Sequence, residues 1–292
     1  MFAGSVLSTT TGVLRSEGRR QIPLLRNLLF GLSRTRPYRK FDGRNARRAR
    51  LTEEAEAGMR ALVVGGSGGL GAAFVSLLTT DSRFNHVTAW SRSAVSVGGD
   101  KTCTRPIDLR DEATIAVASQ ELGAVDVVLI ATGLLHDNDM KPEKTWRSLE
   151  PATMMRAFEI NAIGPALIAK HVLPLLPRDR RAVFAALSAR VGSIGDNRLG
   201  GWYSYRASKA ALNQIIRTLS VELAVRHPLA ICVGLHPGTV DTGLSKPFQA
   251  GVPEDKLTTP AIAAARLMDV IARLTPQDSG KVFDWQGNVV PE

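Results

Sequence analysis

The chain has little cysteine, few aromatic residues and no long apolar run. Its 292 residues include two cysteines, Cys103 and Cys232, and neither stands near a Cys-x-x-Cys pair or a Cys/His cluster. This argues against a metal site and a disulfide framework, and it fits a reducing compartment. The best apolar stretch, AVDVVLIATGLL, contains Asp126 and is shorter than the roughly 18 residues of a membrane span. We therefore expect no metal and no membrane segment.

Acidic residues are outnumbered, and the formal net charge is +10. The excess belongs mostly to the first 58 residues, which carry twelve Lys and Arg against five Asp and Glu. The rest of the chain has 25 basic residues against 22 acidic ones. Since the body has an ordinary surface charge, we expect no nucleic-acid partner.

Residues 1–58 are rich in Arg, Ser and Thr, have no strand pattern and are expected to be a disordered basic leader. Leucines from Leu24 to Leu32 would line one face of a helix, as in an organelle transit peptide. Alternatively, the true start is Met59, which opens MRALVVGG, and the preceding residues come from an upstream start. We expect a cytoplasmic protein, or one of the mitochondrial matrix if the leader is a transit peptide.

From Met59 onward, short apolar runs alternate with amphipathic stretches. This alternation is typical of an α/β protein with a parallel sheet covered by helices on both faces. We expect residues 59–292 to form one doubly wound Rossmann domain. The expected strands are 60–64, 86–90, 102–107, 125–130, 182–187, 230–235 and 281–285. The expected helices are 70–80, 111–121, 151–176, 204–226 and 259–273.

A glycine-rich segment, VVGGSGGLG, joins the first expected strand to the first expected helix. Gly65, Gly69 and Gly71 have the spacing G-x-x-x-G-x-G. Glycines at such a junction permit a tight turn and let backbone N–H groups approach a pyrophosphate at the helix N-terminus. The segment therefore predicts a nucleotide site.

The cofactor is predicted from Arg92. About twenty residues after the glycine segment, a site for NAD would place an acid beside the ribose 2′-hydroxyl. This chain reads Ser91-Arg92-Ser93 there. A guanidinium and two hydroxyls suit a 2′-phosphate, so NADP(H) is expected in preference to NAD(H).

Two of the three tyrosines, Tyr203 and Tyr205, stand just before Lys209 at the start of an amphipathic stretch. On a helix, residues four apart share a face, whereas residues six apart do not. A lysine ammonium beside a phenol favours the ionised phenol. Tyr205 is therefore the tyrosine that can work with Lys209, and Tyr203 is expected to form the wall or mouth of the site with Trp202.

Further landmarks follow one another along the chain: ATG at 131–133, Asn161 within FEINAIGPAL, and HPGTVDT at 236–242. Together with the glycine segment and the Tyr205/Lys209 pair, they resemble the short-chain dehydrogenase/reductase family over residues 59–292. The string GGWYSYRASKAALN resembles the subgroup of C-factor and Sniffer-type carbonyl reductases. Two positions depart from the family: Val64 replaces its usual Thr, and ATG replaces its Asn-Asn-Ala-Gly motif.

The resemblance implies a carbonyl reductase that transfers hydride from NADPH. Tyr205 would act as general acid. Lys209, together with the positive nicotinamide ring of the oxidised cofactor, would bring the phenol pKa down, and Lys209 would also hold the ribose. Asn161 would hold a water that resupplies the proton. The residues expected to contact the cofactor are Gly65, Ser67, Gly69, Leu70, Gly71, Arg92, Asp108, Leu109, Ala131, Thr132, Gly133, Tyr205, Lys209, Pro237, Gly238, Val240 and Thr242.

The family's carbonyl-polarising serine has no direct match. It is usually the second residue of Ser-Ser-x-x-Gly, and the string here is Ser-Ala-Arg-Val-Gly, from Ser188 to Gly192. Alignment thus puts Ala189 at that position. We expect Ser188 to take the role, with Ser193 in the following loop as the other candidate.

Two functions from different classes fit these residues. The leading one is a carbonyl reductase or alcohol dehydrogenase, and the other is an NAD(P)H-binding regulator with little or no turnover. An epimerase or dehydratase acting on nucleotide sugars would need a larger C-terminal domain. The loops 134–149 and 243–258 are expected to shape the substrate pocket. The resemblance implies that helices 151–176 and 204–226 often pair between subunits, so a homo-oligomer is possible.

Overall fold

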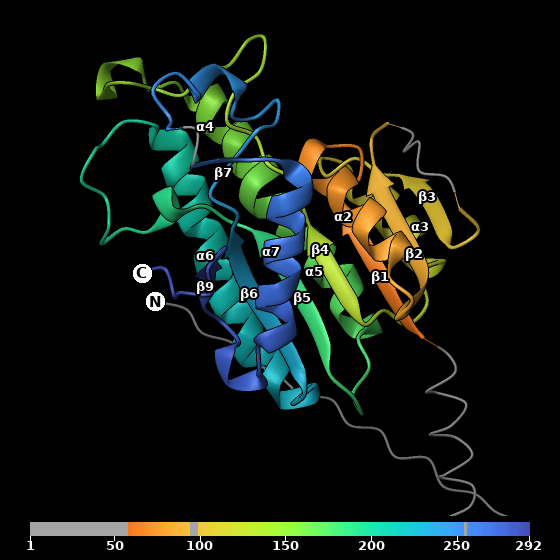
Figure 1. Ribbon diagram of the computed structural model, residues 1–292. Coiled ribbons are helices and arrows are strands. Elements are labelled where there is room, and N and C mark those ends of the chain that lie inside the picture. Colours follow the sequence, from red (N-terminus) through yellow and green to blue (C-terminus); the bar gives the residue numbers. More distant parts are fainter. Residues whose placement is uncertain (1–57, 94–98, 254–255) are drawn as a thin grey trace, which may run out of the picture. The chain divides into compact units, whose positions relative to one another are not determined.

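The computed structural model describes residues 58–93, 99–253 and 256–292. The leader expected at residues 1–58 therefore lies, except for Gly58, outside the described residues. The main sheet has seven strands: β1 Met59–Val64, β2 Phe84–Ser91, β3 Thr102–Pro106, β4 Val127–Ile130, β5 Ala182–Leu187, β6 Ala230–His236 and β9 Val282–Asp284. Their order is β3-β2-β1-β4-β5-β6-β9, and every neighbouring pair is parallel (Figure 1). The expected doubly wound sheet is confirmed.

Strand β1 explains why helices cover both faces of the sheet. Ala61 and Val63 point to one face, Leu62 and Val64 point to the other, and all four are buried. An apolar strand of this kind is stable only when both of its faces are covered. Helices α2 Gly69–Thr80 and α7 Pro260–Arg273 pack on the first face. The second face is covered by α3 Glu112–Gln120, α5 Gly164–Val172 and α6 Tyr203–Arg226.

The expected helix 151–176 is wrong as one continuous helix. It divides into α4 Pro151–Phe158, a π-helical turn η2 Glu159–Ile163, α5 and a 3₁₀ turn η3 Leu173–Leu175. Pro165 lacks the N–H that would bond the carbonyl of Asn161, and this lost bond explains the wider turn. The π-helical turn thus contains Asn161, which the sequence indicated as a site residue.

Two short strands were not expected, β7 Thr239–Val240 and β8 Leu257–Thr258, which pair in parallel as a separate sheet. Two residues are too few to show a period in the sequence. This small sheet ties the segment after β6 to the start of α7.

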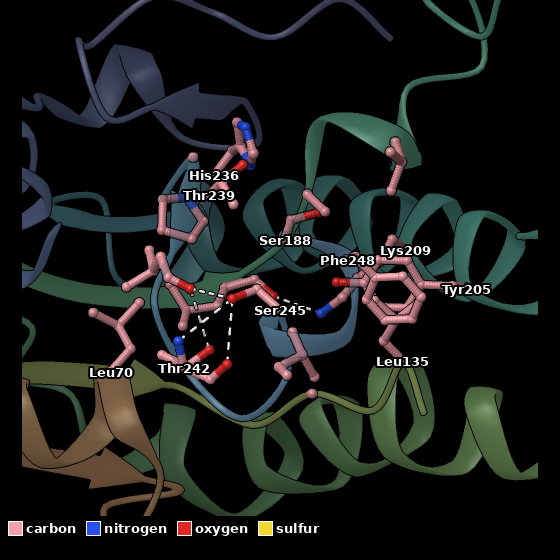
Figure 2. Close-up of a pocket in the computed structure, with 18 of the residues that line it drawn as sticks. Leu70, Leu135, Ser188, Tyr205, Lys209, His236, Thr239, Thr242, Ser245 and Phe248 are labelled. Carbon is pink, nitrogen blue, oxygen red and sulfur yellow. Dashed lines mark hydrogen bonds between the residues drawn. The ribbon is translucent and has the colours of Figure 1, made fainter. Parts of the chain in front are cut away.

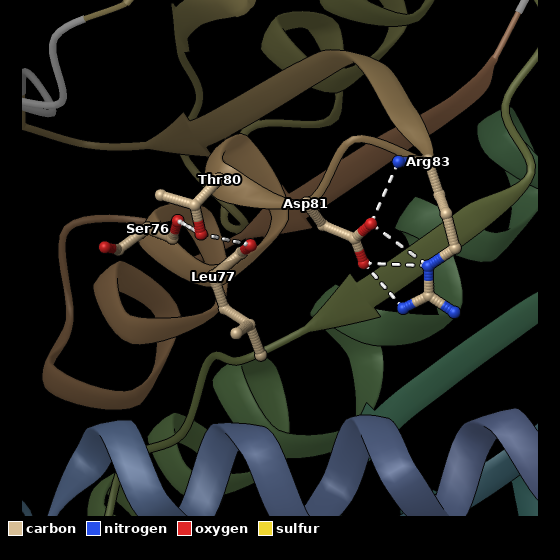
Figure 3. Close-up of polar contacts among 5 residues, drawn as sticks. All are labelled: Ser76, Leu77, Thr80, Asp81 and Arg83. Atoms are coloured by element: carbon tan, nitrogen blue, oxygen red, sulfur yellow. Dashed lines mark hydrogen bonds and ion pairs between the residues drawn. The ribbon is translucent and has the colours of Figure 1, made fainter.

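The turn from α2 into β2 is fixed by polar contacts (Figure 3). Thr80 donates its hydroxyl hydrogen to the carbonyl of Leu77 at 2.9 Å, and Asp81 accepts the backbone N–H of Arg83 at 2.9 Å. The Arg83 guanidinium also binds the Asp81 carboxylate, and this hydrogen bonding holds the pKa of Asp81 below its ordinary value. The carbonyl of Arg83 then accepts the N–H of Met59 at 2.7 Å, which begins the pairing of β1 with β2.

None of the helices in the described residues is long and apolar enough to cross a membrane.

Candidate active site

A cavity of about 750 Å³ lies at the carboxyl ends of the central strands. Residues that follow β1, β4, β5 and β6 line it, as is typical of ligand sites in open parallel sheets. In Figure 2, Leu70 and Thr242 lie on one side of this cavity, and Tyr205 and Leu135 on the other. An elongated ligand can therefore extend from the glycine segment to Tyr205.

The glycine segment after β1 is a turn that larger residues could not form. Gly65 has a φ of +86°, and its N–H donates to the carbonyl of Trp90 at 2.7 Å. A Cβ on Gly71 would lie 2.0 Å from the carbonyl oxygen of Gly65, so only glycine fits at this crossing of strand and helix. No side chain caps the N-terminus of α2, whose N-cap residue is Gly68. The first amides of α2 are therefore available to an anion in the cavity.

Tyr205 and Lys209 share one face of α6 at the floor of the cavity. Their exposed fractions are 7% and 2%, and the Lys209 Nζ lies 5.9 Å from the centre of the phenol ring. The ammonium donates to the carbonyl of Leu187 at the end of β5, at 2.8 Å. Tyr203, in contrast, is 36% exposed and is not among the residues that line the cavity. Trp202 lines the cavity, whereas the expectation that Tyr203 forms its wall or mouth is wrong, since Tyr203 is exposed and does not line it.

In the protein without cofactor, burial shifts the pKa values of both Tyr205 and Lys209. Burial raises the pKa of Tyr205 to about 12 and lowers the pKa of Lys209 to about 8. We expected Lys209 and the oxidised nicotinamide ring together to bring the phenol pKa down. In the protein alone the desolvation of both groups outweighs their attraction, since the ammonium is bonded to a carbonyl and not to the phenol oxygen.

Asn161 links the cavity wall to helix α6 from a fully buried position. Its amide NH₂ donates to the carbonyl of Leu134 at 2.8 Å and to the Ser208 hydroxyl at 3.0 Å. Its Oδ1 accepts the N–H of Leu134 at 2.8 Å, and it flanks Gly133 together with Lys209 Nζ. The π turn that holds Asn161 is of a kind frequent at functional sites.

The two candidate serines have partners in the protein. Ser188 lines the cavity (Figure 2). Its hydroxyl donates to Asn213 Oδ1 at 2.5 Å. Ser193 accepts the N–H of Asp196 at 3.1 Å and does not line the cavity. Ala189, at the family's serine position, packs against Tyr205. The role expected of Ser188 stays a prediction.

The site residues expected from the sequence fall into two groups, those that line the cavity and those that do not. Twelve of the residues that line the cavity were expected to act there: Gly69, Leu70, Ala131, Thr132, Gly133, Ser188, Tyr205, Lys209, Pro237, Gly238, Val240 and Thr242. The others lie outside its lining: Gly65, Ser67, Gly71, Arg92, Asp108, Leu109 and Asn161. Arg92 is exposed just after β2, and Asp108 and Leu109 follow β3.

The cavity has an apolar wall near Tyr205 that the sequence did not indicate. Trp202 packs edge-on against Phe248, with ring centres 5.1 Å apart, and against Tyr205 at 6.2 Å. His136 Nε2 donates to the carbonyls of Gly243 at 3.1 Å and Leu244 at 3.2 Å. The loops 134–149 and 243–258 therefore meet beside the site, as expected. The apolar side chains of this wall are Leu135, Ala189, Val191, Trp202, Leu244 and Phe248.

Comparison with known proteins identifies the class. The family model for short chain dehydrogenases matches residues 59–252, so the chain belongs to the short-chain dehydrogenase/reductase family. C-signal of Myxococcus xanthus is 40% identical over 141 residues, which are 48% of this chain and 79% of that protein. The 1-hydroxy-2-glutathionyl-2-methyl-3-butene dehydrogenase of Rhodococcus sp. strain AD45 is 36% identical over 170 residues, or 58% of this chain and 70% of that protein.

Solved structures show the same fold. The NADPH-bound carbonyl reductase from chicken fatty liver is 24% identical with a TM-score of 0.70, over 80% of this chain and 99% of that one. The carbonyl reductase Sniffer of D. melanogaster is 21% identical with a TM-score of 0.71, over 80% of this chain and 100% of that one. The protein is thus an oxidoreductase of a family that binds nicotinamide cofactors.

Proposed function

We propose that this protein is an NADP(H)-dependent oxidoreductase that reduces the carbonyl group of an aldehyde or ketone to an alcohol. The observation that carries the proposal is the buried Tyr205/Lys209 pair at the floor of a cavity whose other end is the glycine segment. Family membership supplies the cofactor class. The reaction and the residue roles are our inference.

The residues present fit a dinucleotide. The crossing of Gly65 and Gly71 leaves no room for a Cβ, and the uncapped start of α2 suits a pyrophosphate. The hydroxyl oxygen of Thr132, buried in the cavity lining, has no hydrogen-bond partner among the described residues, so a bound ribose or phosphate would satisfy it. Arg92 at the end of β2 would contact the 2′-phosphate. The further contacts proposed from the sequence are Ser67, Asp108, Leu109, Pro237, Gly238, Val240 and Thr242.

NADPH, when bound, supplies the hydride, and the chain supplies the proton and the orientation. Tyr205 holds a proton at its hydroxyl, and its raised pKa keeps that proton in place until an alkoxide develops beside it. Lys209 lies one turn further along α6 and orients the ribose through its ammonium. Asn161 Oδ1 has a second lone pair for a water that returns the proton. Ser188 would turn its hydroxyl from Asn213 toward the carbonyl oxygen.

The substrate would carry apolar groups on its carbonyl carbon. The wall beside Tyr205 is built from Leu135, Val191, Trp202, Leu244 and Phe248. Such a surface gains from burying apolar area and offers no ion pair to a charged substrate.

A second candidate is an NAD(P)H-binding regulator with little or no turnover. Two observations favour it: Ala189 replaces the family's serine, and the C-signal of Myxococcus xanthus is a relative at 40% identity. The buried Tyr205/Lys209 pair favours the enzyme, because a regulator has no need of a proton donor at the end of a cofactor cleft.

We also propose that the protein is cytoplasmic and forms a homo-oligomer through the segments 151–176 and 204–226. Apolar side chains on these segments are exposed, among them Met155, Ile163, Val221 and Val225. Such side chains gain when a partner surface covers them. Sedimentation equilibrium would measure the oligomeric state, and a monomer at micromolar concentration would contradict it.

The experiment for the main proposal follows the loss of NADPH absorbance with aldehydes, ketones and quinones. Tyr205→Phe should lower the rate of carbonyl reduction by about 10²–10⁴-fold, because the hydroxyl acts in proton transfer. Its binding of NADPH should stay nearly intact. Tyr203→Phe is the matched control and should keep most of the activity, since Tyr203 does not line the cavity. If Tyr205→Phe reduces carbonyls at the wild-type rate, the regulator becomes the better account.

A further inference from the structure

Glu143 is a buried carboxylate without a cation. It lies in the irregular segment between β4 and α4, its exposed fraction is 3%, and it forms no ion pair with a described residue. One oxygen accepts the N–H of Ser204 at 3.2 Å, and the other accepts the Ser204 hydroxyl. A buried carboxylate is costly unless hydrogen bonds satisfy it, so this contact is specific.

Ser204 is the second residue of α6, the helix that carries Tyr205 and Lys209. The N-cap residue of α6 is Trp202, whose side chain makes no capping hydrogen bond. The first amides of a helix need acceptors, and a negative charge there is favoured by the helix dipole. Glu143 therefore caps the catalytic helix from a different loop.

The backbone before α6 needs support from outside. Gly200, Gly201 and Trp202 have φ values of +62°, +65° and 52°, so three successive residues are left-handed. Trp202 is the only residue other than glycine with a positive φ in the described part of the chain. A side-chain residue rarely keeps this conformation unless its surroundings hold it. The backbone carbonyl of Glu143 accepts the N–H of Trp202 at 2.5 Å, so the same residue holds this strained position.

We propose that Glu143 is a positioning residue that holds Trp202 and Tyr205 in the geometry for carbonyl reduction. Glu143 does not line the cavity, so it acts through these two residues. Trp202 packs against Tyr205 and Phe248, and its indole is part of the apolar wall. Without the cap, the first turn of α6 would loosen, and both the wall and the proton donor would move. The kinetic part of this proposal rests on the proposed function.

The variants are Glu143→Ala, Glu143→Gln and the matched control Glu150→Ala. Glu150 precedes α4, is exposed and makes no capping hydrogen bond through its side chain. In Glu143→Gln the amide oxygen accepts the Ser204 N–H and the NH₂ donates to the Ser204 hydroxyl, so both contacts persist without the charge. Glutamine should therefore rescue what alanine loses.

Hydrogen exchange of the full chain tests the cap without any substrate. Peptides covering residues 200–206 should exchange at least tenfold faster in Glu143→Ala than in wild type, and at the wild-type rate in Glu143→Gln and Glu150→Ala. Unchanged exchange in Glu143→Ala would overturn the proposal. If Glu143→Ala does not fold, Glu143→Asp replaces it, because aspartate draws the carboxylate back by one methylene. Residues 200–206 should then exchange at least tenfold faster in Glu143→Asp than in wild type.

Kinetics tests the consequence for the site. In Glu143→Ala, kcat/KM for carbonyl reduction should fall at least tenfold while the Kd for NADPH stays within twofold of wild type, and Glu143→Gln should keep most of the activity. If glutamine is as impaired as alanine, restoring the hydrogen bonds to Ser204 does not restore the site, and the positioning role is overturned. If wild type reduces none of the carbonyls tested, the proposed function fails, and the exchange result alone decides the role of Glu143.

Discussion

Ala189, which aligns with the family's serine, lines the same cavity as Tyr205 and belongs with it to one buried apolar cluster. The backbone of Ala189 is extended, with a φ of −151° and a ψ of 146°. Successive residues of an extended segment point to opposite sides, and the hydroxyl of the preceding residue, Ser188, accordingly reaches Asn213 on α6. The Ser188 hydroxyl, which we propose polarises the carbonyl, is therefore displaced by one residue from the family's serine position.

The first prediction concerns this displacement. Ser188→Ala should lower carbonyl reduction well below wild type, because a hydroxyl can rotate about its C–O bond from Asn213 to a carbonyl oxygen. The double variant Ser188→Ala/Ala189→Ser should restore or exceed wild-type kcat/KM, since it places the hydroxyl beside Tyr205. One oxyanion donor is worth about 10²–10³-fold in rate, which sets the scale of the gain. Ser193→Ala is the control and should keep most of the carbonyl-reducing activity. Full activity in Ser188→Ala would show that the Ser188 hydroxyl has no part in the reaction.

Cofactor choice is the second prediction. NADPH should bind more tightly than NADH, because Arg92 is the charged residue next to the expected 2′-phosphate. Loss of one charge-assisted hydrogen bond costs about 1.5–3 kcal/mol, so Arg92→Ala should remove most of the preference. Titration of both cofactors into wild type and Arg92→Ala measures it. Equal affinities of wild type for the two cofactors would contradict the role of Arg92.

The third prediction concerns the leader. A chain that begins at Met59 should fold, bind NADPH and turn over like the full-length protein, because β1 begins at Met59 and the main sheet is built from β1 onward. Thermal unfolding and cofactor titration of both chains compare them directly. A truncated chain that is insoluble, or that has lost affinity for the cofactor, would make residues 1–58 part of the domain.

The features that could be predicted from the sequence are those that follow from local periodicity. The strand, glycine turn and helix that begin with β1 follow one another without a gap, so each supported the assignment of the next. The choice of Tyr205 over Tyr203 needed only the 100° turn of a helix. In contrast, Glu143 reaches Ser204 across 61 residues of sequence, and no period connects two such positions.

The apolar wall and the shifted pKa values could not be predicted either, because both depend on contacts between residues far apart in the sequence. Trp202 and Phe248 come from different loops, and only the fold brings them into contact. The burial that raises the pKa of Tyr205 is likewise a property of the packed molecule. The sequence showed a lysine near a phenol, and it could not show that both would be removed from water.

The last prediction uses the lowered pKa of Lys209. Its pKa is about 8 in the folded protein and 10.5 in its ordinary state, so between these values the unfolded chain binds more protons than the folded one. The free energy of unfolding therefore rises with pH across this window through Lys209. Lys209→Met has no such group, and the stability difference between wild type and this variant should move in favour of wild type between pH 8 and pH 10. The expected change is on the order of 2 kcal/mol.

Urea unfolding of both proteins at several pH values between 7 and 10 measures this difference, and the other titrating groups largely cancel in the comparison. The upper limit of pH 10 keeps both proteins below the range in which Tyr205 titrates, since Tyr205 acts in the opposite direction. Its pKa is raised from 10.0 to about 12, so above pH 10 the unfolded chain loses the phenol proton first and stability falls. A stability difference that stays constant from pH 7 to pH 10 would mean that Lys209 titrates as it does in water, and that the ammonium is not buried beside the phenol.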